Sequence, residues 1–215
     1  MSKQILVTGG SSKIGKEFVK LLPKNIIIKK PNKIEWDLSK DKFNRKQVNL
    51  IKNSDKIVIL HSKLSSKSHL KKSFKDITNQ ICLNLTSIIR ICEIALNSNP
   101  KARIVILGSE SGLKGSYDII YALTKSSIHK YVEERKIKYK DQQLLCLAPS
   151  TISDGKMTLK RKDKKNIKKS IYINPKKRGI KSKEISIFIY KLLFEITDYV
   201  SNTTIHINGG KFSRM

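Results

Sequence analysis

The stretch that decides the fold is Lys3–Gly15, KQILVTGGSSKIG, near the N-terminus. Its apolar run Lys3–Thr8 predicts a buried strand, and the amphipathic pattern of Ile14–Leu22 predicts a helix. A turn of glycine and serine separates them. Such a turn lets the backbone approach a pyrophosphate closely, and the N-terminus of the next helix supplies free N–H groups and a positive dipole end. This first strand–turn–helix unit therefore predicts a nucleotide-binding site.

Apolar runs and helical patterns alternate through the remaining sequence. Further strands are expected at Ile26–Ile28, Ile34–Trp36, Ile57–Leu60, Ala102–Leu107, Gln143–Ala148 and Thr203–Ile207. Helices are expected over Asp41–Asn53, Phe74–Leu96, Ile119–Lys138 and Lys183–Phe194. This alternation predicts an α/β fold whose mostly parallel sheet carries helices on both faces. Because no linker or repeat divides the sequence, we expect one domain over residues 1–215.

The charge of the chain is strongly positive, with 45 Lys and Arg against 17 Asp and Glu and a formal net charge of +28. The chain has 38 Lys but only 7 Arg, together with 32 Ile and 13 Asn. Lys, Ile and Asn have A/T-rich codons, so genome base composition accounts for the charge. Phosphate-binding surfaces favour arginine, and we therefore expect no specific nucleic-acid partner.

Cysteine content and hydropathy limit the classes of protein to which the chain can belong. The three cysteines are odd in number and widely spaced, which argues against a disulfide scaffold and fits a reducing cytoplasm. No His, Cys and carboxylate pattern has metal-ligand spacing, so no metal site is expected. No uninterrupted apolar run approaches the ~18 residues of a membrane span. We expect a cytoplasmic protein without a membrane partner.

Tyr121 and Lys125 form a YxxxK pattern at the start of the helix expected over Ile119–Lys138. Positions i and i+4 share one helix face, and a nearby ammonium should lower the pKa of a tyrosine towards neutral pH. The pattern alone is weak, because 38 lysines in 215 residues and 7 tyrosines give about 1.2 matches by chance. A second match, Tyr172 to Lys176, contains Pro175, which disfavours a continuous helix.

The position of a serine strengthens the first match. Ser109 follows the strand expected over Ala102–Leu107 and lies twelve residues before Tyr121. Ligands of open α/β sheets bind at the carboxyl ends of the strands. Ser109 is therefore the preferred partner of Tyr121, and Ser111 is the alternative.

These segments together resemble the short-chain dehydrogenase/reductase family over Lys3–Gly210. The glycine turn is similar to the family's TGxxxGxG, except that Lys13 replaces the middle glycine. Ile104–Lys125 resembles the catalytic segment. Other similar segments are Asn84 in its helix, Asp37-Leu38, Ala148-Pro149-Ser150 and Thr204–Gly210. The family's NNAG motif is missing, because Ile59-Leu60-His61-Ser62 occupies its place.

The resemblance implies a Rossmann-type, doubly wound sheet of seven strands in the order 3-2-1-4-5-6-7. It implies reversible hydride transfer between a nicotinamide cofactor and a carbonyl/alcohol pair. Tyr121 would give the proton, Ser109 would bind the carbonyl oxygen, Lys125 would assist Tyr121 and bind the ribose, and Asn84 would hold a relay water. The implied cofactor-binding residues are Gly9, Ser11, Ser12, Lys13, Ile14, Gly15, Asp37, Leu38, His61, Tyr121, Lys125, Pro149 and Ile152.

Two expectations follow from lysines near these segments. Lys29 and Lys30 follow the second strand and no acid occurs until Glu35, so NADP(H) is preferred and NAD(H) is the alternative. The segment 156–183 carries one acid, Asp163, among many lysines, which predicts a mobile lid that draws in an anionic or carrier-bound substrate. The resemblance further implies a homodimer or homotetramer.

Several functions stay open for the sequence. Within the resemblance, the protein is a carbonyl reductase similar to 3-oxoacyl-carrier-protein reductases, or a sugar-modifying reductase of polysaccharide biosynthesis. A nucleotide-binding protein that has lost catalysis is the second hypothesis, motivated by Lys13 and by Ile59–Ser62. A nucleic-acid-binding protein is the third, motivated by the net charge alone.

Overall fold

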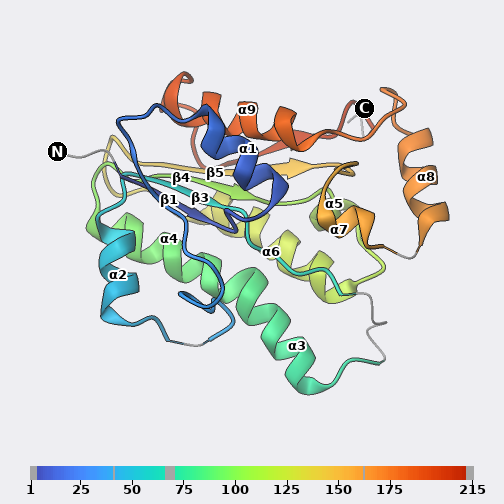
Figure 1. The fold of residues 1–215 in the computed structure, drawn as a ribbon, viewed down its shortest axis with the longest axis horizontal. Coiled ribbons are helices and arrows are strands. Elements are labelled where there is room, and N and C mark those ends of the chain that lie inside the picture. The colour runs from blue at the N-terminus through green and yellow to red at the C-terminus, as the bar shows by residue number, and fades with distance from the viewer. Residues whose placement is uncertain (1–3, 41, 66–70, 162, 212–215) are drawn as a thin grey trace.

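A computed structural model describes residues 4–40, 42–65, 71–161 and 163–211 (Figure 1). Lys3 and Asp41, where a predicted strand and helix begin, lie outside the described residues. The strands are β1 Gln4–Thr8, β2 Ile27–Lys29, β3 Lys56–Ile59, β4 Arg103–Leu107, β5 Gln143–Pro149 and β6 Thr203–Ile207. The helices are α1 Lys13–Leu21, α2 Arg45–Lys52, α3 Phe74–Ile81, α4 Ser87–Ser98, α5 Ser111–Lys114, α6 Ile119–Glu134, α7 Lys156–Leu159, α8 Lys164–Tyr172 and α9 Ser182–Phe194.

The sheet is parallel and has six strands in the order β2-β1-β3-β4-β5-β6. The predicted parallel α/β fold is thus confirmed, with one strand fewer than expected. The missing strand is Ile34–Trp36, which forms a turn. The Asn32 side chain accepts hydrogen bonds from the backbone N–H groups of Ile34 (2.8 Å) and Glu35 (3.1 Å). This local bonding competes with a strand ladder and leaves Ile34 98% exposed.

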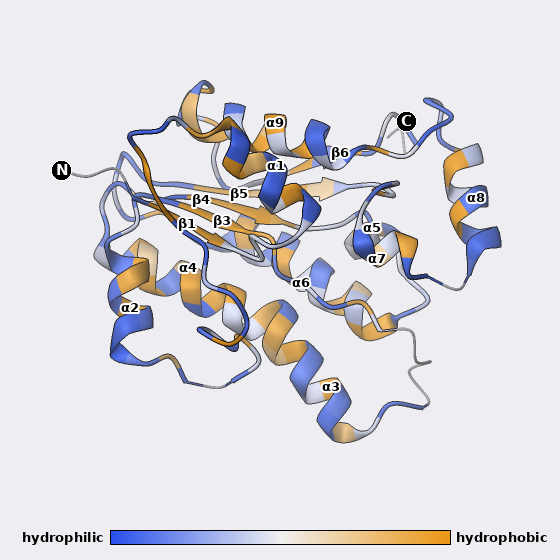
Figure 2. Cartoon of the chain, viewed as in Figure 1, coloured by the Kyte–Doolittle hydropathy of each residue, from blue (hydrophilic) through white to orange (hydrophobic). Residues whose placement is uncertain are grey.

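Side chains alternate between two apolar cores along the central strands β1, β3, β4 and β5. On β3, Ile57 and Ile59 face the layer of α2, α4 and α6, whereas Val58 faces the layer of α1 and α9. Figure 2 shows the strands as the most continuously hydrophobic part of the chain. Burial on both faces explains why these strands are runs of Ile, Leu and Val rather than alternating sequences.

Helices α1 and α9 lie side by side on one face of the sheet (Figure 1). The Ser186 hydroxyl on α9 donates a hydrogen bond of 2.8 Å to the backbone carbonyl of Ile14 on α1, 172 positions away in the sequence. The last helix therefore supports the helix that follows the glycine turn.

The predicted helix over Phe74–Leu96 consists of α3 and α4 with a π-helical stretch, Cys82–Thr86, between them. The run Phe74–Ser98 is long and apolar enough to cross a membrane by length and composition alone. Its α4 half contributes Ile88, Ile91 and Leu96 to the core beneath the sheet, each with no exposed surface. This packing is that of a core helix within the domain.

Candidate active site

A cavity of about 600 Å³ opens at the carboxyl ends of the strands. Its wall contains most of the predicted site residues, namely Gly9, Ser11, Ser12, Lys13, Ile14, Asp37, Leu38, His61, Ser109, Tyr121, Lys125, Pro149 and Ile152. Gly15 and Asn84 do not line it and lie behind residues that do. The structure thus gathers candidate cofactor and catalytic residues around one cavity.

The glycine turn has little space for side chains. Gly9 has φ +69°, and a Cβ there would lie 2.7 Å from the backbone nitrogen of His61. At Gly15, a Cβ would lie 2.6 Å from the Cα of Gly10. Ser12 is the N-cap of α1, and its hydroxyl accepts a hydrogen bond from the Gly15 N–H at 3.0 Å. The turn is therefore a tight backbone cradle at a helix N-terminus, which fits a phosphate group.

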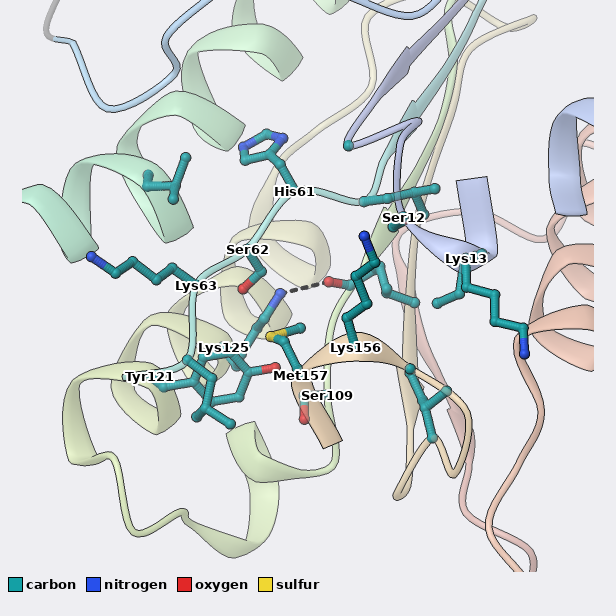
Figure 3. A pocket seen from close by; sticks show the side chains of 18 of the residues that line it. Ser12, Lys13, His61, Ser62, Lys63, Ser109, Tyr121, Lys125, Lys156 and Met157 are labelled. Atoms are coloured by element: carbon teal, nitrogen blue, oxygen red, sulfur yellow. Dashed lines mark hydrogen bonds between the residues drawn. The ribbon is translucent and has the colours of Figure 1, made fainter. Parts of the chain in front are cut away.

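Lys13, which replaces a glycine of the family pattern, directs its charge away from the predicted catalytic residues. Its Nζ lies 3.0 Å from an Oδ atom of Asp154, and Figure 3 shows the side chain turned away from Tyr121 and Lys125. Asp154 also accepts hydrogen bonds from the backbone N–H (2.9 Å) and the hydroxyl (2.8 Å) of Ser182 at the start of α9. The lysine is accommodated because it pairs with an acid outside the turn.

Tyr121 and Lys125 lie on one face of α6, as their spacing predicts, and both are buried. The Lys125 Nζ is 5.7 Å from the centre of the Tyr121 ring and donates a hydrogen bond of 2.6 Å to the Leu107 carbonyl, drawn in Figure 3. The Tyr121 hydroxyl interacts with the side chains of Ser109 and Ser62. Ser109, rather than Ser111, therefore partners the tyrosine.

The second YxxxK match does not form a comparable pair. Helix α8 ends at Tyr172, and Lys176 follows Pro175 beyond it. The Tyr172 side chain is 74% exposed. It is Lys177 rather than Lys176 that lies over the Tyr172 ring, at 4.9 Å from its centre.

Burial dominates the protonation of Tyr121 and Lys125. It lowers the pKa of Lys125 to about 8, and the ammonium of Lys125 has no carboxylate partner among the described residues. It also raises the pKa of Tyr121, although hydrogen bonds from Ser109 and Ser62 act in the opposite direction. The expected lowering of the Tyr121 pKa by Lys125 is therefore wrong for this structure, because loss of solvent outweighs the neighbouring polar groups.

Asn84 sits in the π-helical stretch and is completely buried. Its Oδ1 accepts a hydrogen bond from the Lys63 N–H (2.8 Å), and its Nδ2 donates one to the Lys63 carbonyl (2.9 Å). The Ser62 hydroxyl also donates to Oδ1, at 3.3 Å. Asn84 thus fixes the backbone that carries Ser62, a partner of Tyr121. π-Bulges often occur at functional sites, and the relay water stays a prediction.

His61 bridges three elements at the position of the missing NNAG motif. The Ser87 hydroxyl donates to the Leu83 carbonyl at 2.9 Å, so it accepts from His61 Nε2 at 2.9 Å. This leaves Nδ1 to accept from the Thr8 hydroxyl at 2.7 Å. Burial, followed by the charge of Lys125, lowers the pKa of His61 to about 3. His61 lines the cavity as a neutral crosslink between β1, the end of β3 and α4.

Another part of the cavity wall is formed by residues that follow β2 in the sequence. Lys33, Trp36, Asp37 and Leu38 are on its wall, whereas Lys29 and Lys30 are exposed and are not. Lys33 is thus the lysine after β2 that reaches the cavity wall, and the selection of the cofactor by Lys29 and Lys30 stays a prediction. The Asp37 carboxylate accepts hydrogen bonds from the N–H (3.0 Å) and hydroxyl (2.6 Å) of Ser39.

The basic segment 156–183 contributes its beginning and, near its end, Ser182 to the cavity. Lys156, Met157, Thr158 and Arg161 line it, whereas no residue of α8 does. Figure 1 shows α8 at the edge of the molecule, beyond α7. Lys162 lies outside the described residues. Of the start of this segment, α7 and Arg161 reach the cavity, and its movement as a lid stays a prediction.

Two features of the structure near Tyr121 were not predicted from the sequence. Asp118 is the N-cap of α6 and pairs with Lys72, and both side chains are almost fully buried. Arg161 lies over the Tyr117 ring, with its Cζ 5.1 Å from the ring centre. The position of Asp118 three residues before Tyr121 was an available capping signal, but nothing in the sequence pairs it with Lys72.

Comparison with solved structures agrees with this geometry. The chain superposes on a short chain dehydrogenase family protein from Francisella tularensis subsp. tularensis SCHU S4 with a TM-score of 0.82 and 22% identity, covering 98% of this chain and 99% of that one. The chain has the fold of the short-chain dehydrogenases. Neither a sequence model of a protein family nor a curated protein sequence matches it.

Two further structures share the short-chain dehydrogenase fold with this chain. A short-chain dehydrogenase/reductase (glucose/ribitol dehydrogenase) from Brucella melitensis has a TM-score of 0.80 and 21% identity, with 99% of this chain and 97% of that one covered. A 3-oxoacyl (acyl-carrier-protein) reductase from Agrobacterium tumefaciens C58, with NADP bound, has a TM-score of 0.79 and 20% identity, covering 97% and 93%.

Proposed function

We propose that the protein is an NAD(P)(H)-dependent oxidoreductase that interconverts a carbonyl and a secondary alcohol. The observation that carries this proposal is the position of Tyr121, Ser109 and Lys125 on the wall of one cavity that also contains the glycine turn at Gly9. The resemblance in sequence and the shared fold support the same chemistry.

The cofactor fits the residues that are present. Gly9 and the N-terminus of α1 offer backbone N–H groups to a diphosphate, because the turn leaves no room for a Cβ. Lys125 would hold the nicotinamide ribose, and Asp37 with Leu38 would flank the adenine. When bound, the nicotinamide group accepts or supplies the hydride.

The side chains of this chain manage the proton and the carbonyl oxygen. Ser109 donates a hydrogen bond to that oxygen and polarises it. Tyr121 transfers its hydroxyl proton to the developing alkoxide. The Lys125 ammonium stabilises the resulting phenolate when it turns from the Leu107 carbonyl towards the cofactor side. Asn84 keeps Ser62 and the adjoining backbone in place, and it would hold the water that returns a proton.

NADP(H) is the preferred cofactor in this proposal. Lys33 lines the cavity beside Asp37 and can pair with a 2′-phosphate, while the Asp37 carboxylate is engaged by Ser39. Solved structures of the same fold contain NADP or NADPH.

Replacement of Tyr121 tests the reaction. Tyr121→Phe keeps the ring and removes only the proton donor, so turnover should fall by about 10²–10⁴-fold while cofactor affinity stays within about twofold. Tyr172→Phe is the matched control, since it alters the exposed tyrosine of the other YxxxK match. NADPH oxidation would be followed with neutral ketones, 3-oxoacyl thioesters and keto sugars. Full activity of Tyr121→Phe refutes the assigned role.

A nucleotide-binding protein without turnover is the second candidate, and Lys13 and His61 at two departures from the family pattern favour it. The same experiment separates the two functions. Tight NADPH binding by fluorescence titration, with no oxidation by any carbonyl of the panel, would select the second candidate.

Self-association forms part of the proposal. The outer face of α6 carries a shallow depression lined by Ser126, Ser127, Lys130, Tyr131 and Glu134, which a two-fold axis could bury from both copies. Light scattering at micromolar concentration should give a dimer or tetramer mass, and a monomer mass contradicts it. We place the protein in the cytoplasm, with no membrane or specific nucleic-acid partner.

A further inference from the structure

Arg161 is positioned by two neighbours on the wall of the cavity. Asp163 accepts hydrogen bonds from Nε (2.9 Å) and Nη2 (2.5 Å) of its guanidinium. The ring of Tyr117 lies beneath it, with Cζ 5.1 Å from the ring centre. Only 22% of the Arg161 side chain is exposed. A guanidinium held on one edge and one face is preorganised for a ligand at its remaining donors.

The remaining edge of the guanidinium is free to bind. Within the described part of the chain, no hydrogen bond is formed by Arg161 Nη1. Arg161 lines the same cavity as Ser109 and Tyr121, and the Tyr117 ring beneath it lies four residues before Tyr121 in the sequence. The free donors thus belong to the substrate end of the cavity.

Arg161 is on the cavity wall together with Ser109 and Tyr121. Figure 3 shows the Lys156 amine on the side of Ser12 and the Lys63 amine directed away from Tyr121. The one acid on the wall beside Ser109 is Glu110, and its carboxylate is already paired with Lys211 at 3.1 Å. In the proposed function the cofactor phosphates belong to the glycine turn. Arg161 is therefore placed for an anion other than those phosphates.

We propose that Arg161 binds an anionic group, a carboxylate or a phosphate, on the carbonyl compound that the protein reduces. Its Nη1 edge donates to the anion while Asp163 and Tyr117 hold the guanidinium in place. Met157 from α7 covers the space beside Tyr121 and Ser109 (Figure 3) and contacts the uncharged part of the substrate. This inference rests on the proposed reductase function and specifies its substrate class.

The kinetic test compares 2-oxo and 3-oxo acids of four to six carbons with their methyl esters. Wild type should prefer the acids in kcat/KM. Arg161→Gln should lower kcat/KM for the acids by roughly tenfold to hundredfold, the range for losing a charge-assisted hydrogen bond, and leave the esters within about threefold. Arg161→Lys keeps the positive charge but not the planar guanidinium. Its kcat/KM for the acids should lie between the values of wild type and Arg161→Gln. Arg178→Gln is the control, since Arg178 also pairs with an acid, Glu184, in the same basic segment but does not line the cavity.

A binding measurement keeps the two proposals separable. Calorimetric titration of 3-hydroxybutyrate into the protein saturated with NADP⁺ should show binding that Arg161→Gln weakens about tenfold or more and Arg178→Gln does not. If no carbonyl is reduced but this dependence is observed, the reductase function fails and the anion site stands. If acids and esters are reduced equally, or the two arginine variants bind equally, the anion site is refuted while the reductase function survives.

Discussion

Breaking the buried pair of Asp118 and Lys72 should destabilise the protein more than any surface ion pair. Their charged atoms are 2.5 Å apart, with side-chain exposures of 1% for Lys72 and 0% for Asp118. Asp118 also accepts hydrogen bonds from Gln80 Nε2 (2.7 Å), the Ser65 N–H (2.8 Å) and the Tyr121 N–H (3.2 Å). Asp118→Asn keeps the shape but leaves the Lys72 ammonium without its counter-ion, which costs about 3–5 kcal/mol.

Urea unfolding measures this loss. With a slope of about 2 kcal/mol per molar urea, a loss of about 4 kcal/mol lowers the midpoint by about 2 M. Glu195→Gln is the control, because its pair with Lys191 at the end of α9 is 52–53% exposed and contributes only about 0.3–0.5 kcal/mol. Lys72→Met combined with Asp118→Asn should recover much of the loss, since no buried charge remains. A midpoint for Asp118→Asn within about 0.5 M of wild type refutes the reasoning.

Acid should reproduce the effect of this substitution. Burial tends to raise the pKa of Asp118, but hydrogen bonds from Lys72 and Gln80 outweigh it, so the pKa is lowered from its ordinary value near 3.8. A lowered pKa means that this stabilisation is complete above the ordinary pKa and is lost as the pH falls through the folded-state value. Asp118→Asn should therefore unfold with less dependence on pH below about 4.

Three further predictions concern the cavity. Burial disfavours the charged form of Lys125 and gives it a pKa of about 8. The free energy of unfolding of wild type, measured in urea, should therefore rise between pH 8 and 10, while that of Lys125→Met stays constant. Parallel pH profiles of the two proteins contradict this. Gly9→Ala should weaken NADPH binding at least tenfold by fluorescence titration, whereas Gly115→Ala, at φ +84° with nothing within 4 Å of the new Cβ, should not. Lys33→Gln should lower the ratio of kcat/KM for NADPH over NADH by about tenfold, and an unchanged ratio excludes Lys33 from the 2′-phosphate site.

Structural features that depend on residues close together in the sequence could be predicted from the sequence. Buried strands such as Ile57–Leu60 are apolar because both faces are covered, and Tyr121 meets Lys125 because four residues make about one helical turn. Ile34–Trp36 also contains a β-branched and an aromatic residue, types that favour strands, yet the Asn32 side chain bonds the backbone there into a turn. Composition could not distinguish these two cases.

Interactions between distant segments could not be predicted in the same way. The use of both ring nitrogens of His61 depends on Thr8 and Ser87, which lie 53 and 26 residues from it. The position of Lys33 on the cavity wall likewise depends on the course of the chain after β2. Such partners are set by tertiary packing, which the spacing of residues along the sequence does not reveal.

The pairing of α1 with α9 has a consequence for synthesis of the protein. At about 5–20 residues per second, the ribosome releases Ser186 roughly 10–30 seconds after Ile14, its hydrogen-bond partner 172 residues earlier. During that interval the apolar side of α1, including Phe18, has no α9 to cover it. The nascent chain therefore exposes the apolar side of α1 to chaperones, and the helix after the glycine turn gains its contact with α9 only when translation is almost finished. A messenger truncated before α9 would yield a product prone to aggregation.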